Sequence, residues 1–121
     1  MATKTEGNHS AEFLLYSEET LSLDKGILIT GQNLAAGTVL GKITASGKYT
    51  LHNNAASDGS EVAVAILYDD TNATSADTPC TVVSRIAEVA DAKLIFKSGI
   101  SGANRTAAIA ALATQHIIAR T

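Results

Sequence analysis

Apolar residues in this chain recur mainly at every second position, in short runs separated by polar, glycine-containing stretches. The clearest run is EVAVAILYDD, residues 61–70, in which valine, isoleucine and tyrosine at even positions alternate with alanine and leucine at odd positions. A period of two is the spacing of a β-strand, and apolar residues on both faces are typical of a strand inside a packed structure. The pattern therefore predicts that residues 61–70 form a central strand.

Several further β-rich runs predict additional strands. Residues 37–44 and 48–52 are joined by the sequence ASG, in which Gly47 supplies the positive φ that a tight hairpin needs. The polar stretches 53–60 and 71–78 are expected to be loops. The other predicted strands are two short strands or extended segments at 13–19 and 25–30, a long strand at 79–90, a short one at 92–96 and a last one at 116–120.

One segment has the pattern of a helix instead. The sequence ANRTAAIAALATQ, residues 103–115, is rich in alanine, and Ala108, Ile109 and Leu112 fall at helical spacing. We therefore expect a single short amphipathic helix near the C-terminus. The fold class that follows is a mixed, β-dominated (α+β) structure.

The first twelve residues differ from the rest, since they are polar and show no periodicity. A segment of this kind cannot bury enough surface to offset the entropy lost on ordering, so we expect residues 1–12 to form a flexible N-terminal arm. An arm of this kind can bind a partner by adding a strand to the edge of its sheet. Residues 13–121 are expected to form one β-rich domain.

Composition limits the classes of partner. The nine lysine and arginine residues against twelve aspartate and glutamate residues give a net charge of -3, which does not attract nucleic acid or an anionic membrane. No apolar run approaches the roughly 18 residues of a membrane span, so we expect a chain made and folded in a cytoplasm. Aromatic residues make up only 4% of the chain, so its core contains few large side chains, which favours help from oligomerisation.

The stretch GKITASGKYT, residues 41–50, invites comparison with a phosphate-binding loop. Such a loop has four residues between its glycines, followed by lysine and then a serine or threonine whose hydroxyl binds Mg²⁺. Here five residues separate Gly41 from Gly47, and Tyr49 stands where the hydroxyl residue belongs. The glycines and Lys48 are therefore interpreted as the turn of a hairpin.

Cysteine and histidine residues offer little chemistry. Cys80 is the only cysteine, and its position in TPCTVV, at the start of a predicted strand, indicates a buried structural thiol. His9, His52 and His116 lie far apart in the sequence and lack the short spacings of metal ligands. We expect no metal and no cofactor.

Acidic pairs are the remaining candidates for catalysis. Glu18 with Glu19, and Asp69 with Asp70, are adjacent and polar. Neighbouring residues of a strand point to opposite faces, so these pairs are interpreted as solvated side chains instead of a general acid and base. No G-x-S-x-G nucleophile motif occurs either. The sequence therefore does not predict an enzyme.

A longer stretch carries a resemblance to a known family. NLAAGTVLGKITASGKYTLHNNAASDGSEVAVAIL, residues 33–67, resembles a block of the head decoration proteins of lambda-like tailed phages, the protein D family. The A-G-T-V-L-G start, the G-K-aromatic turn and the D-G before an apolar strand occur in the same order. The segments 6–19 and 107–120 are also similar to the N-terminal segment and the helix-plus-strand end of that family.

This resemblance implies a β-clip-like fold and a homotrimer that decorates the outside of the virion capsid at three-fold and quasi-three-fold positions of the expanded head. It implies that the trimer acts as a cement protein, whose partner is the major capsid protein. It also implies that the arm orders against that partner by adding a strand to its sheet. The implied capsid-binding residues are Ala2, Thr3, Lys4, Thr5, Glu6, Gly7, Asn8, His9 and Ser10.

An alternative from another class is a small β-rich carbohydrate- or ligand-binding module. Its recognition surface would be formed by the polar loops at residues 51–60 and 69–78. Aromatic platforms usually anchor sugars and other ring-shaped ligands. The chain has no Trp, three Tyr and two Phe residues, so it offers few such platforms.

Overall fold

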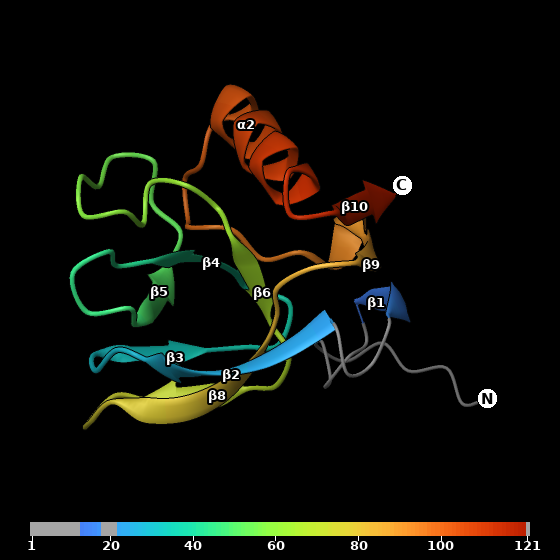
Figure 1. The fold of residues 1–121 in the computed structure, drawn as a ribbon. Coiled ribbons are helices and arrows are strands. Elements are labelled where there is room, and N and C mark those ends of the chain that lie inside the picture. Colours follow the sequence, from blue (N-terminus) through green and yellow to red (C-terminus); the bar gives the residue numbers. More distant parts are fainter. Residues whose placement is uncertain (1–12, 18–21, 121) are drawn as a thin grey trace.

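The computed structural model describes residues 13–17 and 22–120 (Figure 1). Within this part of the chain, most elements are short β-strands, and one α-helix, α2, lies near the C-terminus. The β-dominated fold class predicted from the sequence is therefore confirmed. The strands form a small barrel, a three-stranded sheet beside it and a two-stranded ribbon.

The barrel consists of five strands in the closed order β2-β5-β4-β6-β8. All its neighbouring pairs are antiparallel except β2 and β5, and β8 closes the barrel by pairing with β2 from Leu23↔Val83 to Leu28↔Thr78. Closure leaves no free edge within the barrel. Its strands are β2 (Leu23–Leu28), β4 (Val39–Lys42), β5 (Tyr49–Leu51), β6 (Ala65–Leu67) and β8 (Thr78–Val83).

Alternate residues of all five barrel strands fill its interior. Leu28, Leu40, Leu67 and Val82 are fully buried there, and the ring of Tyr49 completes the cluster. Cys80 belongs to the same cluster and is only 7% exposed, so the predicted buried thiol is confirmed.

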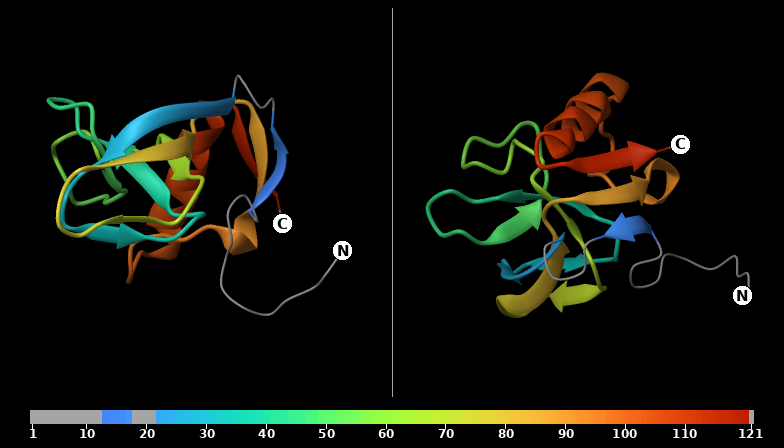
Figure 2. Two further views of the ribbon diagram at one scale, coloured as in Figure 1. Left: turned by 90° about the horizontal axis from the view of Figure 1, so that it is seen from below. Right: turned by 45° about the vertical axis from the view of Figure 1, so that its right-hand side comes forward.

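The three-stranded sheet contains β1 (Leu14–Ser17), β9 (Ala87–Ala90) and β10 (Ile117–Arg120) in the order β1-β9-β10. The strand β10 runs parallel to β9, whereas β1 runs antiparallel to it and forms one edge. Figure 2 shows this sheet beside the barrel, with α2 (Gly102–Ala113) next to both.

A second core joins the barrel to this sheet and to the helix. The residues of barrel strands that face away from the interior, Val39, Ile66 and Val83, pack with Val89 of β9 and Leu112 of α2. All five are fully buried. Each barrel strand involved therefore has apolar residues on both faces, which explains the continuous apolar runs in the sequence.

Helix α2 confirms the predicted helix, with bounds one residue earlier at its start and two residues earlier at its end. Ser101 caps its first turn, because its hydroxyl accepts a hydrogen bond from the backbone N–H of Asn104 at 3.1 Å. Ala108 and Leu112, one turn apart, form its buried face.

Three predicted strands differ from the structure. The run at 79–90 is two strands in different sheets, because the backbone of Ile86 takes a left-handed φ of 49° between β8 and β9. Only Ala65–Leu67 of the run at 61–70 is a strand, and Val62 is 49% exposed. The run at 92–96 begins in a 3-10 turn, η1 (Asp91–Lys93), and Ile95 makes only an isolated bridge with Thr38.

A two-stranded ribbon was not predicted. It consists of β3 (Gln32–Leu34) and β7 (Thr71–Ala73), which pair antiparallel. Residues 71–78 were expected to be a polar loop, and this expectation is wrong for Thr71 and Ala73, which are buried. Three residues of mixed polarity are too few to show a period of two.

Candidate functional site

The predicted capsid-binding residues Ala2–Ser10 lie outside the described residues, so their assignment stays a prediction. The structure does describe the element to which this segment leads. Residues 1–12 precede β1, the edge strand of the three-stranded sheet, which pairs on one side with β9. Any pull on the N-terminal segment therefore reaches the domain through β1 and its hydrogen bonds to β9.

The GKITASGKYT stretch is a hairpin that connects β4 to β5, as its composition predicts. Ile43 N–H donates to the Lys48 carbonyl at 2.9 Å, and Gly47 N–H donates to the Ile43 carbonyl at 2.8 Å. Gly47 has a φ of 73°, which a residue without Cβ adopts without strain. These backbone amides close the turn, so they are not arranged as a cradle for phosphate.

A loop containing the D-G sequence packs directly against this hairpin. Thr44 N–H donates to the Asp58 carbonyl at 2.8 Å. A Cβ on Gly41 would lie 2.5 Å from the Ser60 carbonyl oxygen, and one on Gly59 would lie 2.6 Å from the Lys42 carbonyl oxygen. Gly59 also has a φ of 109°. The two backbones can approach this closely only because both positions are glycine.

The Asp58 side chain holds the loop in shape. Its Oδ1 accepts hydrogen bonds from the Ser60 backbone N–H at 3.0 Å and from the Ser60 hydroxyl at 2.5 Å. These bonds from Ser60 lower the pKa of the exposed Asp58 carboxyl. The sequence features that carry the family resemblance thus have a structural role, which is to lock the loop onto the hairpin.

Among the described residues, Cys80 and His52 are buried titratable side chains, whereas His116 is exposed. Burial raises the pKa of the Cys80 thiol, which favours the unreactive protonated form. Burial also lowers the pKa of His52, whose Nε2 lies 3.1 Å from the Glu61 carbonyl oxygen and whose Nδ1 has no partner. His116 is exposed and lies at the junction between α2 and β10.

Only one of the two acidic pairs falls within the described residues. Glu18 and Glu19 lie outside the described residues, and the Asp70 carboxylate accepts a hydrogen bond from Ala36 N–H at 2.8 Å. Across the described ranges 13–17 and 22–120, no group of three or more histidine, cysteine, aspartate or glutamate residues is placed to hold a metal ion. In the same ranges, no helix is long and apolar enough to cross a bilayer.

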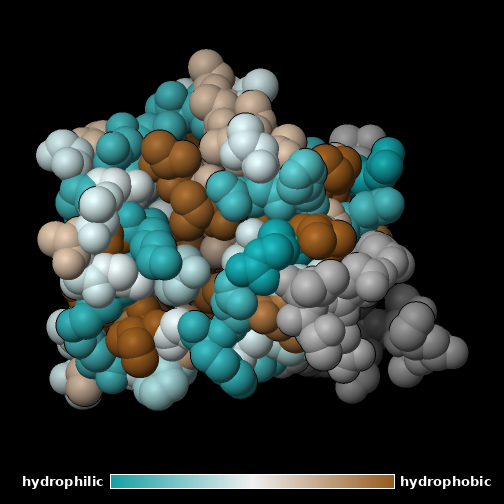
Figure 3. Space-filling view, in the orientation of Figure 1, coloured by the Kyte–Doolittle hydropathy of each residue, from teal (hydrophilic) through white to brown (hydrophobic). Residues whose placement is uncertain are grey.

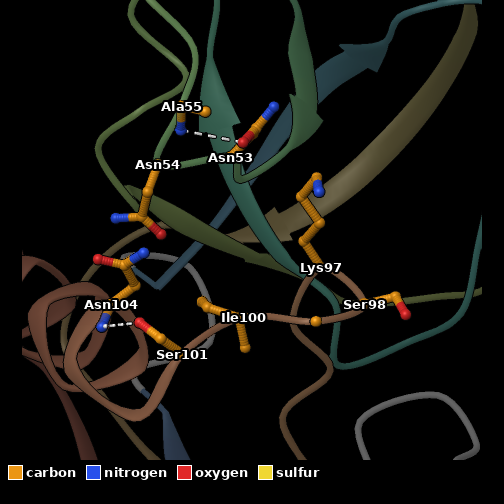
Figure 4. Close-up of a pocket in the computed structure, with 9 residues that line it drawn as sticks. Asn53, Asn54, Ala55, Lys97, Ser98, Ile100, Ser101 and Asn104 are labelled. Carbon is orange, nitrogen blue, oxygen red and sulfur yellow. Dashed lines mark hydrogen bonds between the residues drawn. The ribbon is translucent and has the colours of Figure 1, made fainter.

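A shallow polar pocket of about 210 Å³ lies at the N-terminal end of α2 (Figure 4). Asn54 and Asn104 project toward each other from opposite walls, and Lys97 and Ser98 lie on the connecting loop. No histidine, carboxylate or aromatic residue lines the pocket. Its amides are suited to hydrogen-bond a polar group.

Exposed apolar side chains are spread over several elements. The large ones are Leu15, Ile27, Val62, Ile86, Ile95 and Ile118. On the face shown in Figure 3, the hydrophobic residues form small separate groups among polar ones. Dispersed apolar residues of this kind are normal on a soluble surface.

The groups described above lie on a small closed barrel whose Asp58 loop is packed tightly against the hairpin between β4 and β5. The sequence matches the family model of the bacteriophage lambda head decoration protein D over residues 3–117. The chain therefore belongs to this head decoration family. A search of curated proteins gives no match.

Membership of the family carries three consequences. It implies a capsid decoration role, in which the protein binds to the capsid of a phage head. It implies a location on the virion capsid. The family is structural and not catalytic.

Proposed function

We propose that this protein is a capsid cement. Homotrimers bind the outer surface of the expanded phage head at three-fold and quasi-three-fold sites, and they stabilise the shell against the pressure of packaged DNA. The family match over residues 3–117, which covers nearly the whole chain, carries this proposal. A ligand that binds only the intact shell stabilises it by mass action, so each bound trimer raises the free energy of rupture.

The N-terminal segment is the proposed capsid anchor. Residues Ala2–Ser10 add a strand to a sheet of the major capsid protein, and residues 13–121 act as one decoration domain that holds this arm. The polar, aperiodic composition of the segment and its position directly before the edge strand β1 support this arrangement. Backbone hydrogen bonds supply the affinity, so no special side chains are needed.

Trimerisation makes weak arms effective. Each arm alone binds weakly, because it loses conformational entropy when it orders on the shell. Three arms on one trimer act at a high effective concentration, so their contacts combine into firm attachment. We place the contacts between subunits on apolar strands instead of loops.

The alternative of a carbohydrate-binding module has no comparable support. The polar pocket at the start of α2 is lined by small and amide side chains and lacks an aromatic platform for a sugar ring. The family is also a structural one.

Binding to purified heads tests the proposal. The protein is mixed with expanded heads and with unexpanded shells of its phage, and the bound fraction is measured by co-sedimentation. Saturable binding to expanded heads, with a copy number in multiples of three per site, is the expected result. Selectivity follows if the acceptor edge forms only on expansion, so equal binding to both shells would contradict that part. No binding to either shell would contradict the cement role itself.

A further inference from the structure

One end of the barrel carries charged side chains at positions that face its interior. Asp24 lies two residues before Gly26 and four before Leu28 on β2, and Lys42 lies two residues after Leu40 on β4. Alternation along a strand puts these residues on the same face as the buried leucines. Ser84 follows β8 in the same way, two residues after Val82. The barrel mouth at this end is therefore polar, whereas the layers behind it are apolar.

These side chains surround a hollow of about 260 Å³. Tyr49 closes it on the barrel side, because its buried ring fills the space over Gly26. The mouths of β-barrels are a preferred place for binding sites. The residues that line this hollow are Asp24, Lys42, Tyr49, Val64, Ser84, Arg85 and Gln115.

The Asp24 carboxylate at the barrel mouth already has two partners. Arg85 Nη2 lies 2.5 Å from Asp24 Oδ2, and the Ser84 hydroxyl donates to the same oxygen at 2.7 Å. The hydrogen bond from Ser84 and then that from Arg85 lower the pKa of Asp24, so this carboxyl is ionised at neutral pH. The charged residues that line the hollow are two cations, Lys42 and Arg85, and one carboxylate, Asp24, whose pKa the charge of Lys42 also helps to lower.

Lys42 is the charged group at the barrel mouth that can bind an anionic ligand. Its Nζ lies 5.5 Å from the centroid of the Tyr49 ring, a cation–π contact that holds the side chain over the floor of the hollow. Among the described residues, no hydrogen bond or ion pair involves this ammonium group. By contrast, Lys48 pairs with Asp77, and Lys25 donates to Thr81 on the outer face of the barrel. Within the described ranges, the three N–H donors of Lys42 are thus positioned without a hydrogen-bond acceptor.

We propose that the barrel mouth binds the carboxylate of an aspartate or glutamate side chain on the major capsid protein, with Lys42 as its ion-pair partner and Arg85 beside it. This inference rests on the proposed function, which makes the partner a protein shell. Carboxylates are the ordinary anionic groups of an unmodified protein surface, and the hollow has ample room for one such side chain. The mouth would then be a second contact with the shell, separate from the N-terminal arm.

Charge reversal at the mouth tests this contact. Lys42→Glu places two carboxylates face to face, so we expect it to weaken binding to expanded heads about tenfold or more. Lys42→Arg keeps the cation, and its affinity is expected to stay within about threefold of the native chain. The matched control is Lys25→Glu, which makes the same charge change on the outer face of the same barrel and is expected to have an effect of no more than about threefold. Circular dichroism confirms that each variant is folded.

The possible results separate the two proposals. If the native chain binds heads and Lys42→Glu binds equally well, the contact at the mouth is refuted and the cement role stands. Equal losses in Lys42→Glu and Lys25→Glu would refute it too, since they would reflect net charge alone. If Lys42→Glu abolishes the trimer in sedimentation equilibrium, the carboxylate belongs to a neighbouring copy and the capsid assignment is wrong. If the native chain fails to bind heads, the cement role itself fails.

Discussion

The ring of Tyr49 on β5 lies so close to Gly26 on the neighbouring strand β2 that a Cβ at position 26 would be 2.5 Å from Cε2 and 2.7 Å from Cδ2. The ring is buried and packs in the barrel cluster, so moving it aside would disturb that packing. Gly26→Ala is therefore expected to lower the free energy of unfolding by about 1–3 kcal/mol, the usual cost of overpacking a core. Urea-induced unfolding measures this difference.

Gly102→Ala is the matched control for Gly26→Ala. Position 102 begins α2, and a Cβ there would meet nothing within 4 Å. Alanine favours the helix over glycine by about 1 kcal/mol, so this variant is expected to be as stable as the native chain or slightly more stable. Equal unfolding midpoints for Gly26→Ala and the native chain would show that the barrel interior is looser than this packing implies.

The lock between the loop and the hairpin gives a second prediction. Gly59→Ala adds a Cβ 2.6 Å from the Lys42 carbonyl oxygen at a residue whose φ is 109°. Gly99→Ala adds one at a φ of 82°, but with no atom within 4 Å. Both variants bear backbone strain of about 1 kcal/mol or more, and only Gly59→Ala also displaces the opposing backbone. The melting temperature of Gly59→Ala should therefore be clearly lower than that of Gly99→Ala. Equal melting temperatures of the two variants would contradict the close packing of the loop against the hairpin.

Ile86 allows a test of backbone strain. It is 36% exposed and has a left-handed φ of 49°, which is unfavourable for a β-branched residue. Ile27 has the same exposure but lies in the extended strand β2. Asparagine tolerates the left-handed region, so Ile86→Asn should cost about 1–2 kcal/mol less stability than Ile27→Asn. Equal losses in chemical denaturation would mean that Ile86 is not strained.

His52 predicts a pH dependence of stability. Burial holds its pKa below its ordinary value of 6.5 in the folded protein. As the pH falls through 6.5, the unfolded chain therefore takes up a proton at His52 that the folded protein does not yet accept, and stability decreases. The free energy of unfolding should thus be lower at pH 5.5 than at pH 7.5, and His52→Gln should reduce this difference. An unchanged difference in the variant would exclude His52 as its source.

The sequence predicts correctly those elements that are determined by residues close together in the chain. The hairpin around Gly47 and the alanine-rich helix that became α2 are determined by local turn geometry and local periodicity, and both are confirmed. The long strand expected at 79–90 is wrong because its pattern continues unbroken through Ile86, where the chain leaves the barrel for another sheet. Only contacts distant in sequence, such as the hydrogen bond from the Ser22 hydroxyl to the Ile86 carbonyl, hold that bend.

The polar barrel mouth could not be predicted from the sequence either, because its residues are far apart in the chain. Asp24 and Lys42 lie on β2 and β4, Ser84 follows β8, and nothing in their local sequences indicates that they meet. They come together because the barrel closes and its strands are staggered. The alternation of Asp24 with Gly26 and Leu28 was the one available signal, since it places a charge on an inward-facing position. Its meaning depends on the strand order, which the sequence alone does not give.

The most direct test of the cement account is co-sedimentation of the protein with expanded heads, in which the full chain is compared with a chain lacking residues 1–12. The account predicts that the full chain saturates the heads and that the truncated chain, although folded, stays in the supernatant at the same concentration. Equal binding of both chains would contradict the role of Ala2–Ser10 as the capsid anchor, and failure of the full chain to bind would contradict the cement function.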